Sequence, residues 1–280
     1  MPEGHTLRRL ALDLTAAFAG EPVRVGSPQG RFAAEAADLD GEVLVAAESA
    51  GKHLFLAFPG ERFVHIHLGL IGAFDILPLA AGEEAPAPRG AVRLRLVGRR
   101  AVADLRGATQ CALIGAERRD AVLAGLGADP LRPDADPDRA WERIRTSKRS
   151  IGELLMDQAI VAGVGNVYRA EVLFRQRLDP FRPGTSLRKG QWQAIWDDLV
   201  ELMADGVRVN RIDTVRPEHT PEAMGREARV DDHGGEVYVY RRTGQPCFVC
   251  GAAVRTEPMA SRNLFWCPRC QRRWRLRAVR

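Results

Sequence analysis

Four of the chain's five cysteines form two close pairs near the C-terminus, and this array constrains the local fold more than any other feature. Two residues separate Cys247 from Cys250 and Cys267 from Cys270, and 16 residues separate the pairs. Two disulfides or a redox pair fit a cytosolic chain poorly. Four thiolates at this spacing are typical of a tetrahedral zinc site with a β-hairpin between the pairs. The sequence therefore predicts one structural Zn²⁺, because four cysteine ligands leave no open position on the ion.

The first residues carry a chemistry that no internal position offers. Removal of Met1 would leave Pro2 with a free secondary amine, which can attack a sugar carbon and form an iminium ion, and Glu3 can supply the proton. Apolar residues recur with helical spacing over residues 4–19, so this pair would start a helix. A terminal amine has a pKa of about 7.7–8.0, against about 10.4 for lysine, and a helix N-terminus disfavours its protonated form. Because a terminus is usually a frayed end, the interpretation depends on the rest of the chain.

Between residues 23 and 113 the pattern changes to short strands separated by glycine and proline. Apolar and basic residues alternate strictly over 92–96, which is typical of a half-buried strand. Residues 79–90 predict a loose connection. An antiparallel β-sandwich or flattened barrel fits this region best. The clearest strands are expected at Val43–Val45, Leu54–Phe58, Phe63–Ile66, Val92–Val97 and Ala101–Leu105.

Residues 127–138 carry three prolines and four aspartates and predict an interdomain linker. Beyond it the helical period returns. Residues 213–235 are polar and rich in glycine and proline, so we expect them to be mobile, and Val237–Tyr240 predicts a short strand before the cysteines. Helices are expected at Trp141–Arg145, Ile151–Gln158, Asn166–Arg175 and Lys189–Asp205.

The turn before the third of these helices admits two interpretations. Gly163 and Gly165 permit positive φ and close approach of another backbone, and Asn166 is a good helix N-cap. Free N–H groups at a helix start form a phosphate site. Most such turns merely connect helices, so the turn alone does not establish a function.

Several residues of the strand region are equally ambiguous. Lys52, at the entry to a strand, is most simply a solvated side chain. For His65 and His67, two apart on one strand face, hydrogen-bonded packing is favoured over a metal pair. Residues 68–72 place apolar side chains between glycines, for which core packing is the default and a wedge pushed into a base stack is the functional alternative.

Composition describes an ordinary globular protein, with 45% hydrophobic and 28% charged residues. No apolar run approaches the length of a membrane span, and the N-terminal residues do not resemble a signal peptide, so we expect a cytoplasmic or nucleoid-associated protein. The net charge of +5 is mild, but the last twelve residues hold six arginines and no acid. Because this stretch adjoins the cysteine array, a phosphate-facing patch is favoured over a solvated tail.

Taken together, these motifs resemble the formamidopyrimidine-DNA glycosylase/endonuclease VIII family of base-excision-repair enzymes. The Pro-Glu-Gly start resembles the endonuclease VIII branch, and His5 is similar to its actinobacterial members. The matches run in order through almost the whole chain. They comprise Pro2–Gly4, Gly51–Leu54, His67–Leu70, Met156–Gln158 with Gly163–Tyr168, and Phe265–Pro268 with the cysteine array.

The resemblance implies an α+β multidomain fold. Residues 1–126 would form a catalytic domain made of an N-terminal helix and an antiparallel β-sandwich, and residues 127–140 a linker. Residues 141–236 would form a helix–two-turn–helix DNA-binding domain, and residues 237–280 a C-terminal zinc-finger β-hairpin. The implied activity is that of a bifunctional DNA glycosylase/AP lyase.

The resemblance also assigns the chemistry. The nitrogen of Pro2 would attack C1′ of the damaged nucleotide while Glu3 protonates the sugar ring oxygen, which opens the ring and expels the base. The resulting iminium acidifies the C2′ proton. The 3′-phosphate then leaves by β-elimination, and the 5′-phosphate follows by δ-elimination.

Other residues would hold the DNA. Lys52, Asn166 and Arg262 would grip the phosphates that flank the lesion, with Lys52 and Arg262 counted among the catalytic residues. Leu70 would fill the gap left by the everted base. Arg106 is a candidate for reading the lesion, as is the polar segment before the zinc finger.

Three functions therefore compete. The leading one is excision of oxidised pyrimidines, the rival within the family prefers oxidised purines, and the rival outside it is a non-catalytic zinc-ribbon DNA-binding protein. The joint presence of Pro2, Glu3, Lys52 and Arg262 argues against the last, since binding alone requires no prolyl amine. The expected partner is damaged DNA, with no membrane, and the protein is expected to be a monomer.

Overall fold

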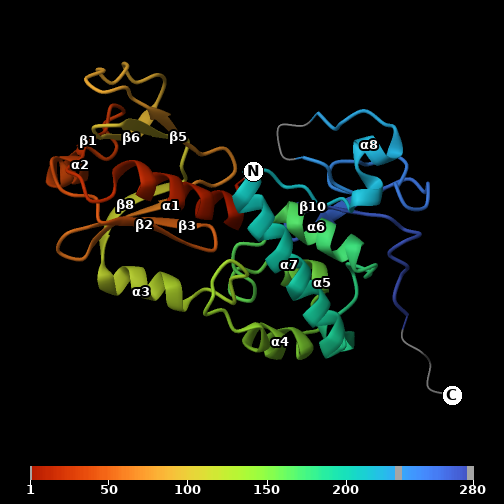
Figure 1. Ribbon diagram of the computed structural model, residues 1–280. Coiled ribbons are helices and arrows are strands. Elements are labelled where there is room, and N and C mark those ends of the chain that lie inside the picture. The colour runs from red at the N-terminus through yellow and green to blue at the C-terminus, as the bar shows by residue number, and fades with distance from the viewer. Residues whose placement is uncertain (1, 231–234, 276–280) are drawn as a thin grey trace. The chain divides into compact units, whose positions relative to one another are not determined.

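The computed structural model describes residues 2–230 and 235–275, which form two compact units (Figure 1). The first unit ends at Gly125 and the second begins at Leu126. None of the helices among the described residues combines the length and the apolar character that crossing a bilayer demands.

The N-terminal unit contains two four-stranded antiparallel sheets, with strand orders β1-β6-β7-β5 and β2-β3-β4-β8. The expected antiparallel β architecture is confirmed, including the loose connection between β5 and β6. The strands are β1 Arg24–Gly26, β2 Ala46–Ala50, β3 His53–Phe58, β4 Arg62–His67, β5 Ala73–Pro78, β6 Val92–Val97, β7 Ala101–Arg106 and β8 Gln110–Gly115, and the helices are α1 Gly4–Phe18, α2 Ala33–Leu39 and α3 Ala116–Ala124.

The strand expected at Val43–Val45 is wrong, because this segment changes its hydrogen-bond partner midway. The N–H of Leu44 donates to the carbonyl of Glu21, whereas the N–H of Val45 donates to that of Ala57. A continuous strand therefore begins only at Ala46.

Helix α1 fixes the start of the chain on the second sheet, and the predicted helix over residues 4–19 is confirmed. Its apolar stripe, including Leu7, Leu14 and Phe18, is buried in the core. The hydroxyl of Thr15 lies 3.2 Å from the carbonyl oxygen of Ala47 and 2.9 Å from its amide nitrogen, which joins the helix to β2.

The C-terminal unit is mainly helical and ends in a two-stranded hairpin. Helix α6 is buried from Asn166 to Phe174 and packs against α7, whose Trp192 and Leu199 lie in the same core. The elements are α4 Pro137–Arg145, α5 Ile151–Leu154, α6 Asn166–Arg175, the 3₁₀ turn η1 Gly184–Ser186, α7 Lys189–Val209, the 3₁₀ turn η2 Pro217–His219, α8 Pro221–Met224, β9 Arg255–Met259 and β10 Arg262–Trp266.

Helices α4 and α5 have boundaries that differ from expectation for local reasons, and α7 ends at Val209, four residues beyond the expected Asp205. Helix α4 begins at Pro137, inside the segment expected to be a linker, because Asp136 caps it by accepting from two N–H groups. Helix α5 ends at Leu154, before Gln158, whose side-chain amide bonds to the backbone of Gly163 and Val164. The amide of Gln158 thus holds the turn that leads to α6.

The segment expected to form a strand at Val237–Tyr240 is not a strand, because a buried carboxylate takes its N–H groups. Glu171 on α6 accepts from the N–H groups of Val239 and Tyr240 at 2.8 Å. Its second oxygen accepts from Tyr238 N–H at 2.7 Å and from the Thr214 hydroxyl at 2.6 Å. The expected mobility of residues 213–235 falls partly on residues 231–234, which lie outside the described residues. Within residues 213–230 the chain forms the 3₁₀ turn η2 and the short helix α8, and the mobility itself stays a prediction.

We predict that Glu171→Gln destabilises the C-terminal unit by about 2–4 kcal/mol, because an NH₂ group would face N–H donors inside the core. All five tryptophans lie beyond residue 126, so tryptophan fluorescence during urea unfolding reports on this unit. Glu201→Gln, at an exposed position of α7, is the matched control. Equal unfolding midpoints for the two variants would contradict the role of Glu171.

Candidate functional site

The two residues predicted to act chemically lie at the start of α1. Glu3 is the N-cap residue of this helix and its side chain is fully buried, while Pro2 is half-buried. His5, in the first turn, is also buried, and burial lowers its pKa to about 4. The imidazole is therefore neutral at pH 7 and adds no positive charge beside the terminus.

Lys52 lies in the two-residue turn that joins β2 and β3. Gly51 supplies the positive φ of +55° that this turn needs, and Ala50 and His53 on either side are cross-strand partners. Burial first, and then the charge of Lys52, lower the pKa of His67. The turn thus holds Lys52 at the end of the sheet rather than on an open surface.

His53, His65 and His67 cluster on one face of this sheet. The Nδ1 of His53 lies 2.8 Å from the Nε2 of His65, and the side-chain nitrogen of Gln110 lies 2.8 Å from the Nδ1 of His65. Burial is the main cause that lowers the pKa of both His53 and His65 to about 4. The cluster is neutral and hydrogen-bonded, as favoured from the sequence over a metal pair.

The turn after β4 presents two apolar side chains to solvent. Leu68 is buried, but Leu70 is 50% exposed and Ile71 is 86% exposed, so core packing does not hold for these two residues. Gly69 has a φ of +70°, and a Cβ there would lie 2.4 Å from the Cγ2 of Thr109. Only glycine therefore fits, and the turn is built to expose its apolar tip.

Arg106, the candidate lesion reader, is held by acidic partners at the end of β7. Its guanidinium lies 2.6 Å from Asp75 and 3.0 Å from Asp104, and its Nε donates to the carbonyl of Arg89 at 2.8 Å. This arrangement ties the 79–91 connection to the sheet. A contact between Arg106 and DNA stays a prediction.

In the C-terminal unit, Asn166 is the first residue of α6 and not its N-cap, which is Gly165. Gly163 has the expected positive φ of +84°, whereas Gly165 is extended. The side-chain nitrogen of Asn166 donates to the backbone carbonyl of Asn263 at 2.9 Å, and the side-chain oxygen of Asn166 accepts from Arg169. Asn166 therefore joins the helix start to strand β10.

Arg169 and Glu171 were not identified from the sequence. Arg169 is fully buried and donates to Asn166 and to the carbonyl of Gly152, at 3.3 Å for the latter. One feature of the sequence could have identified Arg169 and Glu171. Both lie in a predicted helix of largely apolar residues, where a charged side chain needs buried partners.

The cysteine array has the geometry of a zinc site. The four sulfur atoms all lie within 4.8 Å of one another, with 3.4 Å between Cys250 and Cys267 and 3.9 Å between Cys247 and Cys270. Tetrahedral Zn²⁺ with bonds of about 2.3 Å requires sulfur separations of about 3.8 Å. The four ligands therefore fit one structural Zn²⁺ ion.

The hairpin above these ligands places Arg262 beside a tight turn. Ala260 and Ser261 both have positive φ, the conformation of a two-residue hairpin turn, and Arg262 is the first residue of β10. Its guanidinium donates to the Ser261 carbonyl at 2.9 Å and is only partly buried. Arg262 therefore lies at the end of the hairpin, directly after its turn.

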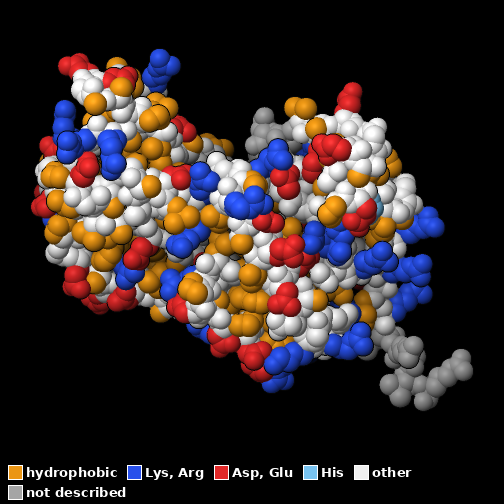
Figure 2. All heavy atoms as spheres, in the orientation of Figure 1, with side chains coloured by type: hydrophobic (Ala, Val, Ile, Leu, Met, Phe, Trp, Pro, Cys, Tyr) orange, Lys and Arg blue, Asp and Glu red, His pale blue; other side chains and the backbone are white. Residues whose placement is uncertain are grey.

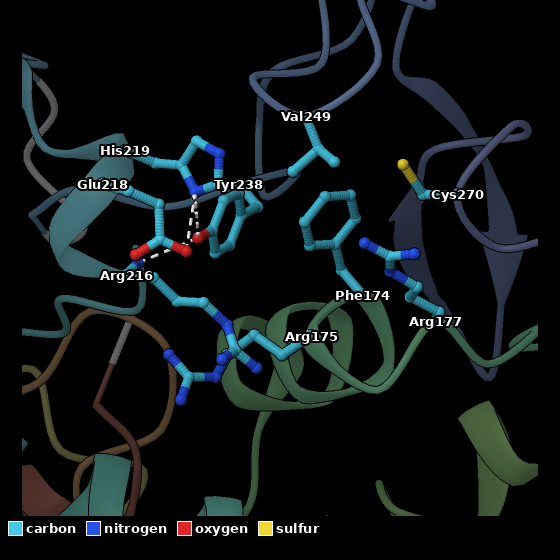
Figure 3. Close-up of a pocket in the computed structure, with 9 residues that line it drawn as sticks. All are labelled: Phe174, Arg175, Arg177, Arg216, Glu218, His219, Tyr238, Val249 and Cys270. Carbon is cyan, nitrogen blue, oxygen red and sulfur yellow. Dashed lines mark hydrogen bonds and ion pairs between the residues drawn. The ribbon is translucent and has the colours of Figure 1, made fainter. Parts of the chain in front are cut away.

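A cavity of about 270 Å³ lies elsewhere in the C-terminal unit (Figure 3). Phe174, Arg175 and Arg177 line it, so it lies at the opposite end of α6 from Asn166, about 14 Å away along the helix axis. None of the residues predicted to act on DNA lines this cavity. The cavity is therefore not part of the site predicted from the sequence.

Comparisons with known proteins cover each part of the chain. Residues 1–111 match the formamidopyrimidine-DNA glycosylase N-terminal domain, residues 126–216 its H2TH domain, and residues 244–273 the zinc finger found in FPG and IleRS. The structure is similar to that of Lactococcus lactis Fpg in complex with abasic-site DNA, with a TM-score of 0.77 at 22% identity, covering 97% of this chain and 100% of that one.

Two curated relatives extend the match over nearly the full length. Endonuclease 8 1 of Mycobacterium tuberculosis is 51% identical over 271 residues, which are 97% of this chain and 100% of the relative. The formamidopyrimidine-DNA glycosylase of Symbiobacterium thermophilum is 32% identical over 97% of this chain and 88% of that protein. The chain is therefore a base-excision-repair DNA glycosylase/AP lyase that belongs to the formamidopyrimidine-DNA glycosylase/endonuclease VIII family.

Proposed function

We propose that this enzyme excises oxidised pyrimidines and cleaves the resulting abasic site through a Schiff base on Pro2. Its identity is 51% to an endonuclease 8 but 32% to a formamidopyrimidine-DNA glycosylase, which favours the pyrimidine branch. The observation that carries the chemistry is the pairing of Pro2 with the buried carboxyl group of Glu3 at the start of α1.

The reaction follows from these two groups. Once Met1 is removed, the lone pair of the Pro2 nitrogen forms a bond to C1′, and Glu3 gives a proton to the ring oxygen as the ring opens. The bond from C1′ to the base breaks, the base leaves with the proton that the Pro2 nitrogen gives up, and the nitrogen carries the positive charge of an iminium. Loss of the C2′ proton then breaks the bond to the 3′-phosphate, and a second elimination releases the 5′-phosphate. Burial of Glu3 keeps bulk water from competing for the proton transfer.

We infer that both units supply phosphate contacts. Lys52 and Arg262 offer cations at turn positions, where phosphate can approach. Asn166 contributes by fixing β10 and by starting a ten-residue helix whose N-terminus attracts anions. The exposed tip of Leu70 and Ile71 is suited to fill the stack after base eversion. We further propose that the enzyme works as a monomer on the cytoplasmic nucleoid, where its DNA substrate lies.

Competing substrates test the lesion class. We expect borohydride to trap a covalent complex faster with duplexes that contain 5-hydroxyuracil or thymine glycol than with 8-oxoguanine. An undamaged duplex is the control. Faster trapping with 8-oxoguanine would instead favour the alternative that prefers oxidised purines. The absence of trapping with every lesion would favour the alternative of a non-catalytic DNA-binding protein.

Pro2→Gly should lower the rate of borohydride trapping at least tenfold while changing lesion-duplex affinity less than threefold. The substitution replaces the secondary amine but leaves the phosphate-binding residues in place. Pro28→Gly, at an exposed loop position of the same unit, is the matched control and should behave as wild type. Parallel losses of trapping and binding in Pro2→Gly would show that Pro2 is structural.

Zinc removal should weaken DNA binding by loosening the hairpin that carries Arg262. Zinc binding supplies about 10–16 kcal/mol in isolated zinc fingers, so the hairpin should not persist without it. We expect Cys267→Ser to lower bound zinc from one per chain to none and to raise the Kd for lesion DNA at least tenfold. Cys111→Ser, which alters the buried cysteine outside the array, should keep its zinc. Full activity in metal-free protein would refute the scaffold role of zinc.

A further inference from the structure

The basic end of the chain has no part in the proposed reaction. After Glu257 the sequence contains seven arginines and no acidic residue. The shared zinc-finger module ends at residue 273, and the M. tuberculosis relative aligns over its full length with 271 of the 280 residues here. Arg272, Arg273 and Arg275 follow the last zinc ligand, Cys270, and are not ligands themselves.

Two clamps fix the direction of the chain after the last zinc ligand. The side chain of Gln271 accepts from Cys267 N–H at 2.9 Å and donates to the carbonyl of Leu178 at 3.0 Å. Three residues later, the N–H of Trp274 donates to the buried carboxylate of Asp179 at 2.8 Å. The backbone over residues 271–274 is thus held against the helical domain and is not a loose tail.

This anchoring turns arginine side chains outward. Arg273 lies over the ring of Phe181 at 3.8 Å and 3.6 Å from Asp179, with its side chain still 61% exposed. Arg272 and Arg275 on either side are exposed, and within residues 2–230 and 235–275 neither forms an ion pair. The segment therefore presents guanidinium groups without acidic neighbours to neutralise most of them.

Two further arginines lie close to the zinc ligands. Arg269 is exposed and stands between the zinc ligands Cys267 and Cys270, and Arg177 is exposed at the end of α6, where it lines the same cavity as Cys270 (Figure 3). Figure 2 shows Lys and Arg side chains gathered along this edge, beside the C-terminal end of the described chain. The basic patch is defined as Arg177, Arg269, Arg272, Arg273 and Arg275.

We propose that the basic patch is an additional DNA-binding surface that contacts backbone phosphates of duplex outside the lesion. Arginine matches phosphate oxygens with two parallel hydrogen bonds and stays charged at every physiological pH. Contacts to phosphates raise affinity regardless of sequence or damage, so the patch holds the enzyme on undamaged DNA during its search. The inference rests on the proposed function only in taking duplex DNA as the substrate.

The test compares two double variants that remove the same charge. R272Q/R275Q removes two of the five positive charges of the patch, whereas R145Q/R208Q removes two exposed arginines that are already paired with Glu142 and Asp205. For an undamaged duplex, the slope of log Kd against log salt should fall by about 2 for the patch variant and remain near wild type for the control. Truncation after Gln271 removes five arginines, three of them in the patch, and should lower the slope by at least about 3 and weaken binding about tenfold at physiological salt.

Two readouts keep the outcome decisive. Zinc content of one per chain shows that the hairpin is intact, and single-turnover excision at saturating enzyme should stay at the wild-type rate. An unchanged salt slope in the truncated protein, or equal losses in both double variants, would overturn the proposal. If full-length protein fails to trap lesion DNA, the activity is refuted while the slopes on undamaged duplex still decide the role of the patch.

Discussion

The organisation of the C-terminal unit depends on the buried carboxylate of Glu171. Its four hydrogen bonds hold three successive N–H groups, those of Tyr238, Val239 and Tyr240, and the hydroxyl of Thr214. A buried charge is costly unless its hydrogen-bonding capacity is filled, and here both oxygens are satisfied. Because three of these partners come from the segment that leads to the zinc ligands, one side chain of α6 anchors that segment.

Helix α6 makes similar connections along its whole length. At its first residue, Asn166 bonds to Asn263 of β10 and is itself held by Arg169. In its last turn, Arg175 forms a buried ion pair with Asp198 of α7 and donates to the carbonyl of Thr214. The helix thus positions the hairpin, the segment before it and the long helix at once. A substitution in α6 would therefore shift the hairpin that carries Arg262, although Arg262 itself is unchanged.

The features that could be predicted from sequence are those fixed by local chemistry. The cysteine spacing specifies four ligands, and the apolar spacing of Leu7, Leu14 and Phe18 specifies α1, since neither depends on distant residues. The strand expected before the cysteines failed because Glu171, far away in sequence, takes its N–H groups. Periodicity reports which residues are apolar and gives no information on a distant polar partner.

The exposure of Leu70 could not be predicted for a related reason. An apolar residue between glycines is usually in the core, whereas here Gly69 has a positive φ and packs closely against Thr109, and Leu70 beyond it is exposed. Similarly, Asn166 is a residue type that is common at helix N-caps, but its side chain bonds to Asn263 and Arg169 instead. Side-chain direction at both sites is decided by tertiary contacts.

The proposed chemistry places opposite demands on the basic groups of the enzyme at one pH. The attacking amine must be neutral, whereas groups that hold phosphate must be charged. A terminal amine, with a pKa of about 7.7–8.0, satisfies the first demand far better than lysine, and arginine satisfies the second because it does not titrate near neutrality. The buried His5, with its pKa lowered to about 4, adds no charge that would oppose iminium formation. Assigning the two tasks to different kinds of nitrogen lets both states coexist near pH 7.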